Sequence, residues 1–185
     1  IIHNPHRNEG IDTAILRDIP FPSTNSTQVK ELLSRCPSSA ITPLVNAEQM
    51  AREQSVGQIS IKDERQRMGL GSFKALGAAY VIAYRAMIEG ERQVGKTYVT
   101  SSAGNHGLSV AAGAKAFGAN SVVYISNTVP EAFATRLMAE GAKVVRAGQV
   151  YEESMEAAKQ AAEDNGWVLL SDTSWPGYYK PSYRL

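Results

Sequence analysis

Residues 73–170 alternate strictly between helix-like and strand-like patterns, and this alternation constrains the fold more than any other feature. Short runs rich in Val, Ile and Tyr are separated by segments long enough to form connecting helices. Parallel strands need such crossover connections, because the chain must return to the same end of the sheet. We therefore expect an α/β fold of three layers, a mostly parallel sheet with helices on both faces. The expected elements are helix 73–89, strand 97–100, helix 105–117, strand 121–126, helix 131–139, strand 143–146, helix 152–164 and strand 167–170.

The first 43 residues do not follow this pattern. Five prolines interrupt them, so we predict an irregular N-terminal segment, residues 1–43, with one short helix at 28–34. A helix over 47–54 and a strand at 58–62 then lead into a glycine-rich loop. The second division, residues 44–185, is expected to carry the regular fold.

Charge and composition narrow the class of partner. Nineteen Lys and Arg face eighteen Asp and Glu, a net charge of +1, which is too balanced to attract nucleic acid or an anionic membrane. No apolar run approaches the about 20 residues of a membrane-spanning helix, and residues 1–9 do not resemble a secretory signal. The lone Cys36 suits a reducing cytoplasm, and the three histidines show no metal-ligand spacing. We expect a cytoplasmic protein with small-molecule partners, no nucleic acid, no membrane and no metal.

Residues 90–97 match the nucleotide-binding pattern G-x-x-x-x-G-K-[ST] in the wrong structural context. A phosphate-binding loop leaves a strand and opens a helix, so that backbone N–H groups and the helix dipole converge on the phosphate. In this chain a predicted helix leads into the segment and a predicted strand leads out. We therefore interpret it as an ordinary helix-to-strand turn.

Ligands of parallel sheets bind beyond the carboxyl ends of the strands, so the loops there are the candidate sites. Residues 101–107 follow a strand and open a helix of small residues, which directs their N–H groups toward a space suited to a carboxylate or phosphate. Asn105 adds an amide donor and acceptor. Asp172 follows the last strand, where it could accept a proton or orient an amine. Taken singly, residues 101–107 are explained equally well by a tight turn. A lone Asp at position 172 is more often a loop or helix cap.

Lys74 lies in the first turn of a predicted helix whose N-cap is Ser72. The positive end of a helix dipole disfavours an ammonium group, and this favours the neutral amine that attacks an aldehyde. A lysine at this position is more often an ordinary surface residue. Its interpretation as a nucleophile therefore depends on its combination with residues 101–107.

Ser72-Phe73-Lys74 and the later Ser102-Ala103-Gly104-Asn105-His106-Gly107 together resemble the signature of fold type II pyridoxal-phosphate enzymes, the tryptophan synthase β-like group. The neighbouring residues are similar to the diaminopropionate ammonia-lyase family, and the similarity runs from about residue 43 to residue 178. The further positions that carry it are Lys62, Asp63, Glu64, Gly69, Leu70, the run 73–80, Asp172, Thr173, Trp175, Gly177 and Tyr178.

The resemblance implies that Lys74 binds pyridoxal phosphate covalently and later moves protons, with Phe73 and Asn105 also in contact with the cofactor. Asp172 matches a family carboxylate proposed as a base. The implied reaction is α,β-elimination, with 2,3-diaminopropionate converted to pyruvate and ammonia, in an enzyme of a family that is usually dimeric. The residues that it implies for binding a small amino-acid substrate are Ser101, Ser102, Ala103, Gly104 and His106, the first four through their backbone. His106 is also interpreted as a structural residue of this loop.

Two departures from the family keep alternatives open. Ala103 stands where these ammonia-lyases carry Asp, so a serine or threonine dehydratase, or a β-replacement enzyme of the same fold, is the closest alternative. The phosphate-binding loop and the partner of the pyridine nitrogen, which the family carries in its second half, are not found. We therefore expect an N-terminal part without the C-terminal half, binding cofactor weakly by itself. A non-catalytic fragment is the alternative from another class.

Overall fold

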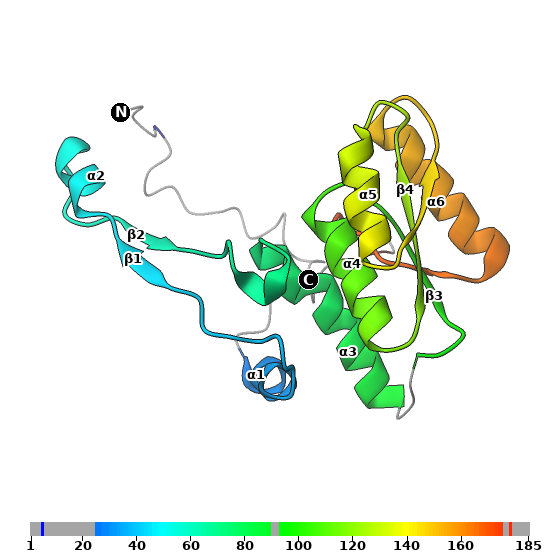
Figure 1. Cartoon of the computed structure of the whole chain (residues 1–185), viewed down its shortest axis with the longest axis horizontal. Coiled ribbons are helices and arrows are strands. Elements are labelled where there is room, and N and C mark those ends of the chain that lie inside the picture. The colour runs from blue at the N-terminus through cyan, green and yellow to red at the C-terminus, as the bar shows by residue number, and fades with distance from the viewer. Residues whose placement is uncertain (1–4, 6–24, 90–92, 176–177, 179–185) are drawn as a thin grey trace.

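The computed structural model describes residues 5, 25–89, 93–175 and 178. Its body is a three-layer α/β unit from which a thin N-terminal arm extends (Figure 1), and the predicted α/β class is confirmed. The elements of the body are α3 (Gly77–Glu89), β3 (Thr97–Ser101), α4 (Asn105–Ala116), β4 (Asn120–Ile125), α5 (Glu131–Ala139), β5 (Lys143–Arg146), α6 (Tyr151–Asn165) and β6 (Val168–Leu169).

The four strands of the body form a parallel sheet in the order β5-β4-β3-β6. From β3 the chain adds β4 and then β5 in one direction. It then crosses back and places β6 on the other side of β3. Ligands of such sheets bind outside the carboxyl ends of the strands, where the order of strands reverses. The topology therefore makes neighbours of the loops that follow β3 and β6.

Helices cover the sheet on both faces. One buried cluster joins α3 and α4 to β3, and a second joins α4 and α5 to β4. A third cluster packs α6 against the opposite face of β3 and β4, as Figure 1 shows. Apolar side chains such as Ile82, Val123 and Leu137 are fully buried, and each contributes roughly 1.5–3 kcal/mol by its removal from water.

Small residues of α4 permit two close approaches. A Cβ atom at Gly107 would lie 2.1 Å from the carbonyl oxygen of Ser102, and one at Gly113 would lie 2.9 Å from the Cα atom of Ala79. Glycine at these two positions lets α4 begin tightly against the loop after β3 and pack directly on α3.

The predicted helix 73–89 is divided in the structure. It begins as a 3₁₀ turn, η2 (Phe73–Leu76), and continues as α3. The hydroxyl of Ser109 in α4 donates to the carbonyl of Ala75 at 3.3 Å and accepts from the N–H of Ala79 at 3.2 Å. It thus occupies the place of a regular helical hydrogen bond between these residues, which interrupts the helix.

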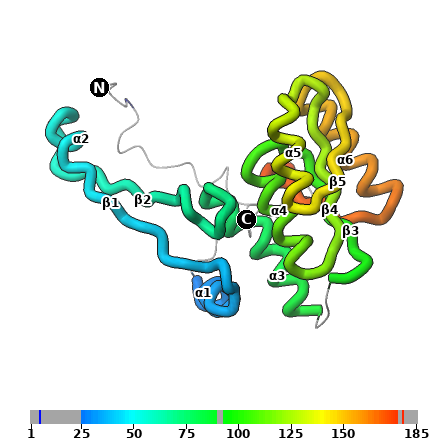
Figure 2. Tube along the Cα trace, in the orientation of Figure 1, coloured from blue at the N-terminus to red at the C-terminus, as the bar shows by residue number. Residues whose placement is uncertain are grey.

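The arm consists of α1 (Thr27–Ser34), β1 (Leu44–Asn46), α2 (Glu48–Glu53) and β2 (Ser60–Lys62). β1 and β2 pair antiparallel, and all their residues are exposed. Figure 2 shows this pair projecting from the body. Strand β1 was not predicted, because three residues between a proline and a helix are too few to show an alternating pattern. Much of the predicted irregular segment 1–43 lies outside the described residues.

Among the helices that the structure describes, none combines the length and apolar character that crossing a membrane requires. Within the same part of the chain, no group of three or more His, Cys, Asp or Glu side chains is arranged to hold a metal ion.

Candidate active site

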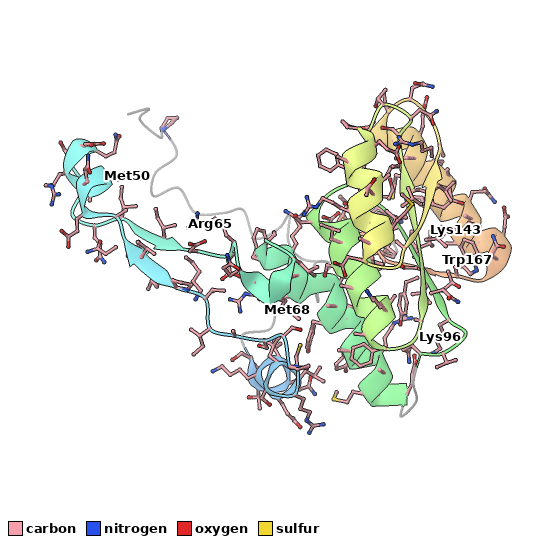
Figure 3. All side chains as sticks on the ribbon, in the orientation of Figure 1. Met50, Arg65, Met68, Lys96, Lys143 and Trp167 are labelled. Carbon is pink, nitrogen blue, oxygen red and sulfur yellow. The ribbon has the colours of Figure 1, made fainter. Side chains whose placement is uncertain are left out.

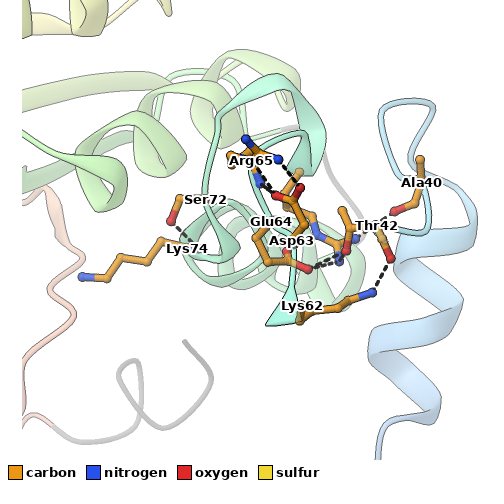
Figure 4. Close-up of polar contacts among 9 residues, drawn as sticks. Ala40, Thr42, Lys62, Asp63, Glu64, Arg65, Ser72 and Lys74 are labelled. Atoms are coloured by element: carbon orange, nitrogen blue, oxygen red, sulfur yellow. Dashed lines mark hydrogen bonds and ion pairs between the residues drawn. The ribbon is translucent and has the colours of Figure 1, made fainter. Parts of the chain in front are cut away.

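The structure brings Lys74 and Asp172 into contact, although they lie 98 positions apart in the chain. The Nζ atom of Lys74 donates to Oδ2 of Asp172 at 2.6 Å. Their side chains are 43% and 26% exposed, so the pair is open to a small molecule. Figure 4 shows the Lys74 side chain extending away from Ser72 and out of its own loop.

Local backbone geometry sets the direction of Lys74. Ser72 is extended, with φ −159° and ψ 151°, and its Oγ atom accepts from the N–H of Lys74 at 3.2 Å, which confirms the predicted N-cap. Gly69 and Gly71 have φ values of +72° and +80°, a region that glycine adopts without steric cost. The glycines therefore allow the sharp turns that place Ser72 at the N-cap of η2 and Lys74 in its first turn.

Asp172 is held as a carboxylate. Its partial burial by itself raises the pKa, but the hydrogen bond from Lys74 and the charge of that ammonium group outweigh this effect. The pKa of Asp172 therefore lies below its ordinary value. The result is a proton acceptor placed directly against the amine of Lys74.

The loop after β3 presents backbone donors at the start of α4. Gly104 is the N-cap of this helix and supplies no side-chain acceptor, while Ser102 Oγ accepts from the N–H of Gly104 at 3.3 Å. The first N–H groups of a helix have no partner within it and favour an anion. Asn105 is exposed at this end. This geometry suits the anion-binding role predicted for residues 101–104.

The side chains of Ser101 and Ala103, in the predicted substrate loop, turn inward or pack on the core. Ser101 is buried and its Oγ lies 2.8 Å from Oγ of Ser154 in α6. Ala103 packs against the cluster of α4 and α5. For Ser101 and Ala103, substrate binding would therefore involve the backbone, as the sequence analysis proposes.

His106 is buried, and its Nε2 atom lies 2.9 Å from the carbonyl oxygen of Leu170. Because a carbonyl only accepts, Nε2 carries the proton and donates. Burial lowers the pKa of His106 below its ordinary value, which favours this neutral form. The ring thus ties the loop after β3 to the end of β6, a structural role that the sequence analysis also proposes.

A depression of about 520 Å³ lies between the arm and the body. Its walls come from β1, β2, residues 62–65, the turn before η2 and the start of α4. Phe73 and Asn105, both predicted to contact a cofactor, line it together. Phe73 is 65% exposed, so its ring is accessible to a ligand in this depression.

A polar cluster that the sequence analysis missed anchors the loop before Lys74. Arg67 donates to both carboxylate oxygens of Glu64, at 2.5 and 2.7 Å, to Thr42 Oγ1 at 2.7 Å and to the carbonyl of Ala40 at 2.9 Å. Lys62 adds a bond to the carbonyl of Thr42 (Figure 4). The hydrogen bond from Arg67 lowers the pKa of Glu64 to about 2. The sequence similarity included Glu64 but gave no sign of its partners.

Residues 93–97 of the nucleotide-like segment lie at the amino end of β3, opposite the edge where ligands of parallel sheets bind. Residues 90–92 lie outside the described residues, but α3 ends at Glu89 and β3 begins at Thr97, which confirms that a helix leads in and a strand leads out. Lys96 pairs with Glu89. Figure 3 places Lys96 with Lys143 and Trp167, which mark the amino ends of β3, β5 and β6, on the side of the body away from the arm.

Comparison with known proteins agrees with the family resemblance of the sequence. Residues 37–181 match a family described as "Pyridoxal-phosphate dependent enzyme". The chain is 33% identical over 156 residues to diaminopropionate ammonia-lyase of Escherichia coli strain K12, a match that covers 75% of this chain and 38% of that protein. It is 34% identical over 102 residues to mouse L-serine dehydratase/L-threonine deaminase, covering 55% of this chain and 30% of the relative.

Solved structures show the same similarity. The holo diaminopropionate ammonia lyase from Escherichia coli superposes with a TM-score of 0.80 at 26% identity, covering 88% of this chain and 46% of that one. The processed form of threonine deaminase isoform 2 from Solanum lycopersicum gives 0.65 at 25% identity, covering 83% and 44%. The chain therefore spans less than half the length of these relatives.

Proposed function

The chain belongs to the pyridoxal-phosphate dependent enzyme family, and on that basis we propose that it carries the cofactor lysine and the acid-base pair of an amino-acid α,β-elimination enzyme. The substrate we propose is 2,3-diaminopropionate, which would yield pyruvate and ammonia. The observation that carries this proposal is the contact between Lys74 Nζ and Asp172 Oδ2 at 2.6 Å, beside the uncapped start of α4.

The residues present fit pyridoxal phosphate. Lys74 offers a partly exposed amine to an aldehyde, and Phe73 and Asn105 line one depression together. Asn105 would hydrogen-bond the ring oxygen and Phe73 would contact the ring. The cofactor supplies an electron sink for the electrons released at the substrate α-carbon.

The two partners of the ion pair would handle the protons. If the cofactor held the Lys74 nitrogen, Asp172 would lose the hydrogen bond that most lowers its pKa, while its partial burial would remain. Its pKa then rises, which makes it a better proton acceptor. Asp172 would take the α-proton, and the Lys74 ammonium would deliver a proton to the leaving β-amine.

The substrate carboxylate would be held by backbone N–H groups of residues 101–104 at the start of α4. Gly107 supports this role, because it allows the helix to begin against the Ser102 carbonyl. Ala103 provides no carboxylate there, so Asp172 is the base that we propose. We expect the L-substrate to be preferred over the D-substrate.

The activity belongs to the complete gene product, since this chain covers 38% of the ammonia-lyase that it matches. We propose that residues 44–185 form the first part of the catalytic fold, preceded by the segment 1–43, and that a later part binds the cofactor phosphate. We propose a homodimer on the basis of the family similarity. We propose a cytoplasmic location because the lone Cys36 suits a reducing compartment.

A serine or threonine dehydratase is the second candidate. Two observations favour it: Ala103 in the substrate loop, and the 34% identity to mouse L-serine dehydratase/L-threonine deaminase. Both enzymes would use Lys74 in the same way, and they differ in the leaving group at the β-carbon.

The test is release of a 2-oxo acid by the complete gene product with pyridoxal phosphate and either L- or D-diaminopropionate, serine or threonine. Pyruvate from diaminopropionate supports the first candidate, and turnover of hydroxy amino acids alone supports the second. Borohydride reduction followed by peptide mapping should place the cofactor on Lys74, with Lys96→Ala as a control that retains labelling. A label on another lysine would overturn the assignment.

A further inference from the structure

Asp172 follows β6, the shortest described strand of the parallel sheet. β6 is two residues long and lies at the edge, paired with β3 through Tyr98↔Val168 and Val99↔Leu169. The last bond of this ladder runs from the N–H of Leu170 to the carbonyl of Val99 at 2.9 Å. Asp172 lies two residues beyond it, so the ladder alone holds its backbone only weakly.

The hydroxyl of Tyr178 bonds the outer edge of this strand on both sides of Leu170. It donates to the carbonyl of Leu169 at 3.0 Å and accepts from the N–H of Ser171 at 2.8 Å. Successive residues of a strand direct their backbone groups to alternate edges, so these two groups face away from β3. The hydroxyl therefore replaces the hydrogen bonds that a further strand would make.

The Tyr178 ring is itself held in place. It stacks on the indole of Trp175, with ring centroids 4.2 Å apart and planes 10° apart, and the Nζ atom of Lys159 in α6 lies 4.7 Å from the centre of the Trp175 ring. The backbones of Trp175 and Tyr178 also exchange hydrogen bonds, at 2.8 and 3.3 Å. The two aromatic side chains thus form one stacked unit, which contacts α6 through Lys159.

We propose that Tyr178 is the positioning residue of Asp172: by bonding the backbone on both sides of Leu170, its hydroxyl sets the direction in which Asp172 leaves β6. This inference rests on the proposed function, because it assigns to Tyr178 an effect on the reaction through Asp172. It also gives a role to Trp175 and Tyr178, which the sequence analysis singled out only by resemblance.

The burial of Ser171 and the protonation of Tyr178 are both consistent with this role. Ser171 is fully buried, so a change in its position is transmitted directly to the next residue, Asp172. Burial raises the pKa of Tyr178 above its ordinary value. The phenol therefore keeps its proton and can donate to Leu169 while accepting from Ser171.

The test compares Tyr178→Phe with the wild-type complete gene product, loaded with pyridoxal phosphate and supplied with L-diaminopropionate. The substitution keeps the stacked ring and removes only the hydroxyl. We expect kcat to fall by about 10- to 100-fold, because a small misplacement of a reacting group has effects of this size. KM should change by less than about threefold, and cofactor labelling of Lys74 should remain.

A double-mutant cycle separates positioning from general structural damage. If Tyr178 acts through Asp172, Tyr178→Phe should lower kcat by less than about twofold in the Asp172→Asn background. Tyr98→Phe is the matched control, since it also removes a buried tyrosine hydroxyl bond, to Gln93 at 2.9 Å, near the amino end of β3. It should leave kcat within about twofold of the wild type.

Several outcomes would overturn the inference while leaving the proposed function in place. They are an unchanged kcat in Tyr178→Phe, or an equal loss with and without Asp172. A second measurement needs neither activity nor a folded variant: the Ser171 amide of the wild type should exchange its hydrogen slowly. Exchange there as fast as at an exposed amide would refute the bond. A wild type that turns over none of the amino acids refutes the proposed function instead.

Discussion

Asp172→Asn should separate catalysis from stability, because the structure predicts a large effect on one and a small effect on the other. The asparagine keeps the shape of the side chain and can still accept from Lys74, but it cannot take up a proton. Loss of a general base lowers rates by about 10²- to 10⁴-fold, equivalent to about 3–5 kcal/mol of activation free energy. We expect a fall in kcat of this size for the L-substrate.

Stability should change little in the same variant. Lys74 and Asp172 are 43% and 26% exposed, and an ion pair with that much solvent contact contributes at most about 1 kcal/mol. The pKa of Asp172 lies below its ordinary value of 3.8 in the folded protein. Its contribution is therefore present above pH 3.8 and is lost as the pH falls through the folded pKa. The stabilities of wild type and variant should converge in that range.

The assay measures kcat and KM for L-diaminopropionate, cofactor labelling of Lys74 and urea unfolding, each for the complete gene product at pH 7. Asp164→Asn, an exposed carboxylate of α6 that accepts from Gln160, is the matched control and should behave as the wild type. Turnover by Asp172→Asn within about threefold of the wild type would remove Asp172 from the mechanism. Loss of labelling would instead show that it is needed to place Lys74.

Three further predictions concern stability and the arm. Gly107→Ala should destabilise the protein by about 1–3 kcal/mol in urea unfolding, because the added Cβ would overlap a backbone carbonyl, whereas Gly104→Ala, with nothing within 4 Å, should not. Thr100→Val should leave stability unchanged or raise it by about 1 kcal/mol, since the Thr100 hydroxyl is buried and has no hydrogen-bond partner among the described residues. Arg67→Met should expose the segment at residue 40 to proteolysis. In the wild type the bonds of Arg67 should protect this segment at pH 4, and the protection should disappear near pH 2, where Glu64 gains a proton.

Periodicity predicted most of the body correctly, for a physical reason. Each helix and strand from residue 97 to residue 169 packs its own apolar side chains against the core. The pattern that predicts the element therefore lies within its own residues. Two failures had causes outside the segment concerned. The break between η2 and α3 depends on the Ser109 hydroxyl, which comes from another helix. Strand β1 depends on its pairing with β2.

The candidate site was predictable only in part. Its residues were assigned to the carboxyl edge of the sheet from the order of strands and loops, and the structure brings Lys74 and Asp172 together there. The strand order that makes β6 a neighbour of β3 is not contained in any local pattern. The bond from His106 to Leu170 also follows from that neighbour relation. The inward direction of Ser101 instead follows from the packing of α6 on β3, which brings Ser154 within reach.

The precision of this site therefore comes from side chains that bond the backbone rather than from the sheet. Two ladder pairs join β6 to β3, yet each of the residues 169–171 has a further bond: the carbonyl of Leu170 accepts from His106, and Tyr178 bonds Leu169 and Ser171 on the open edge. On the other side, Ser72 and the Arg67 cluster fix the loop that carries Lys74. A short strand is sufficient to place a catalytic carboxylate when its backbone groups are bonded on every side, because each bond removes one direction of displacement.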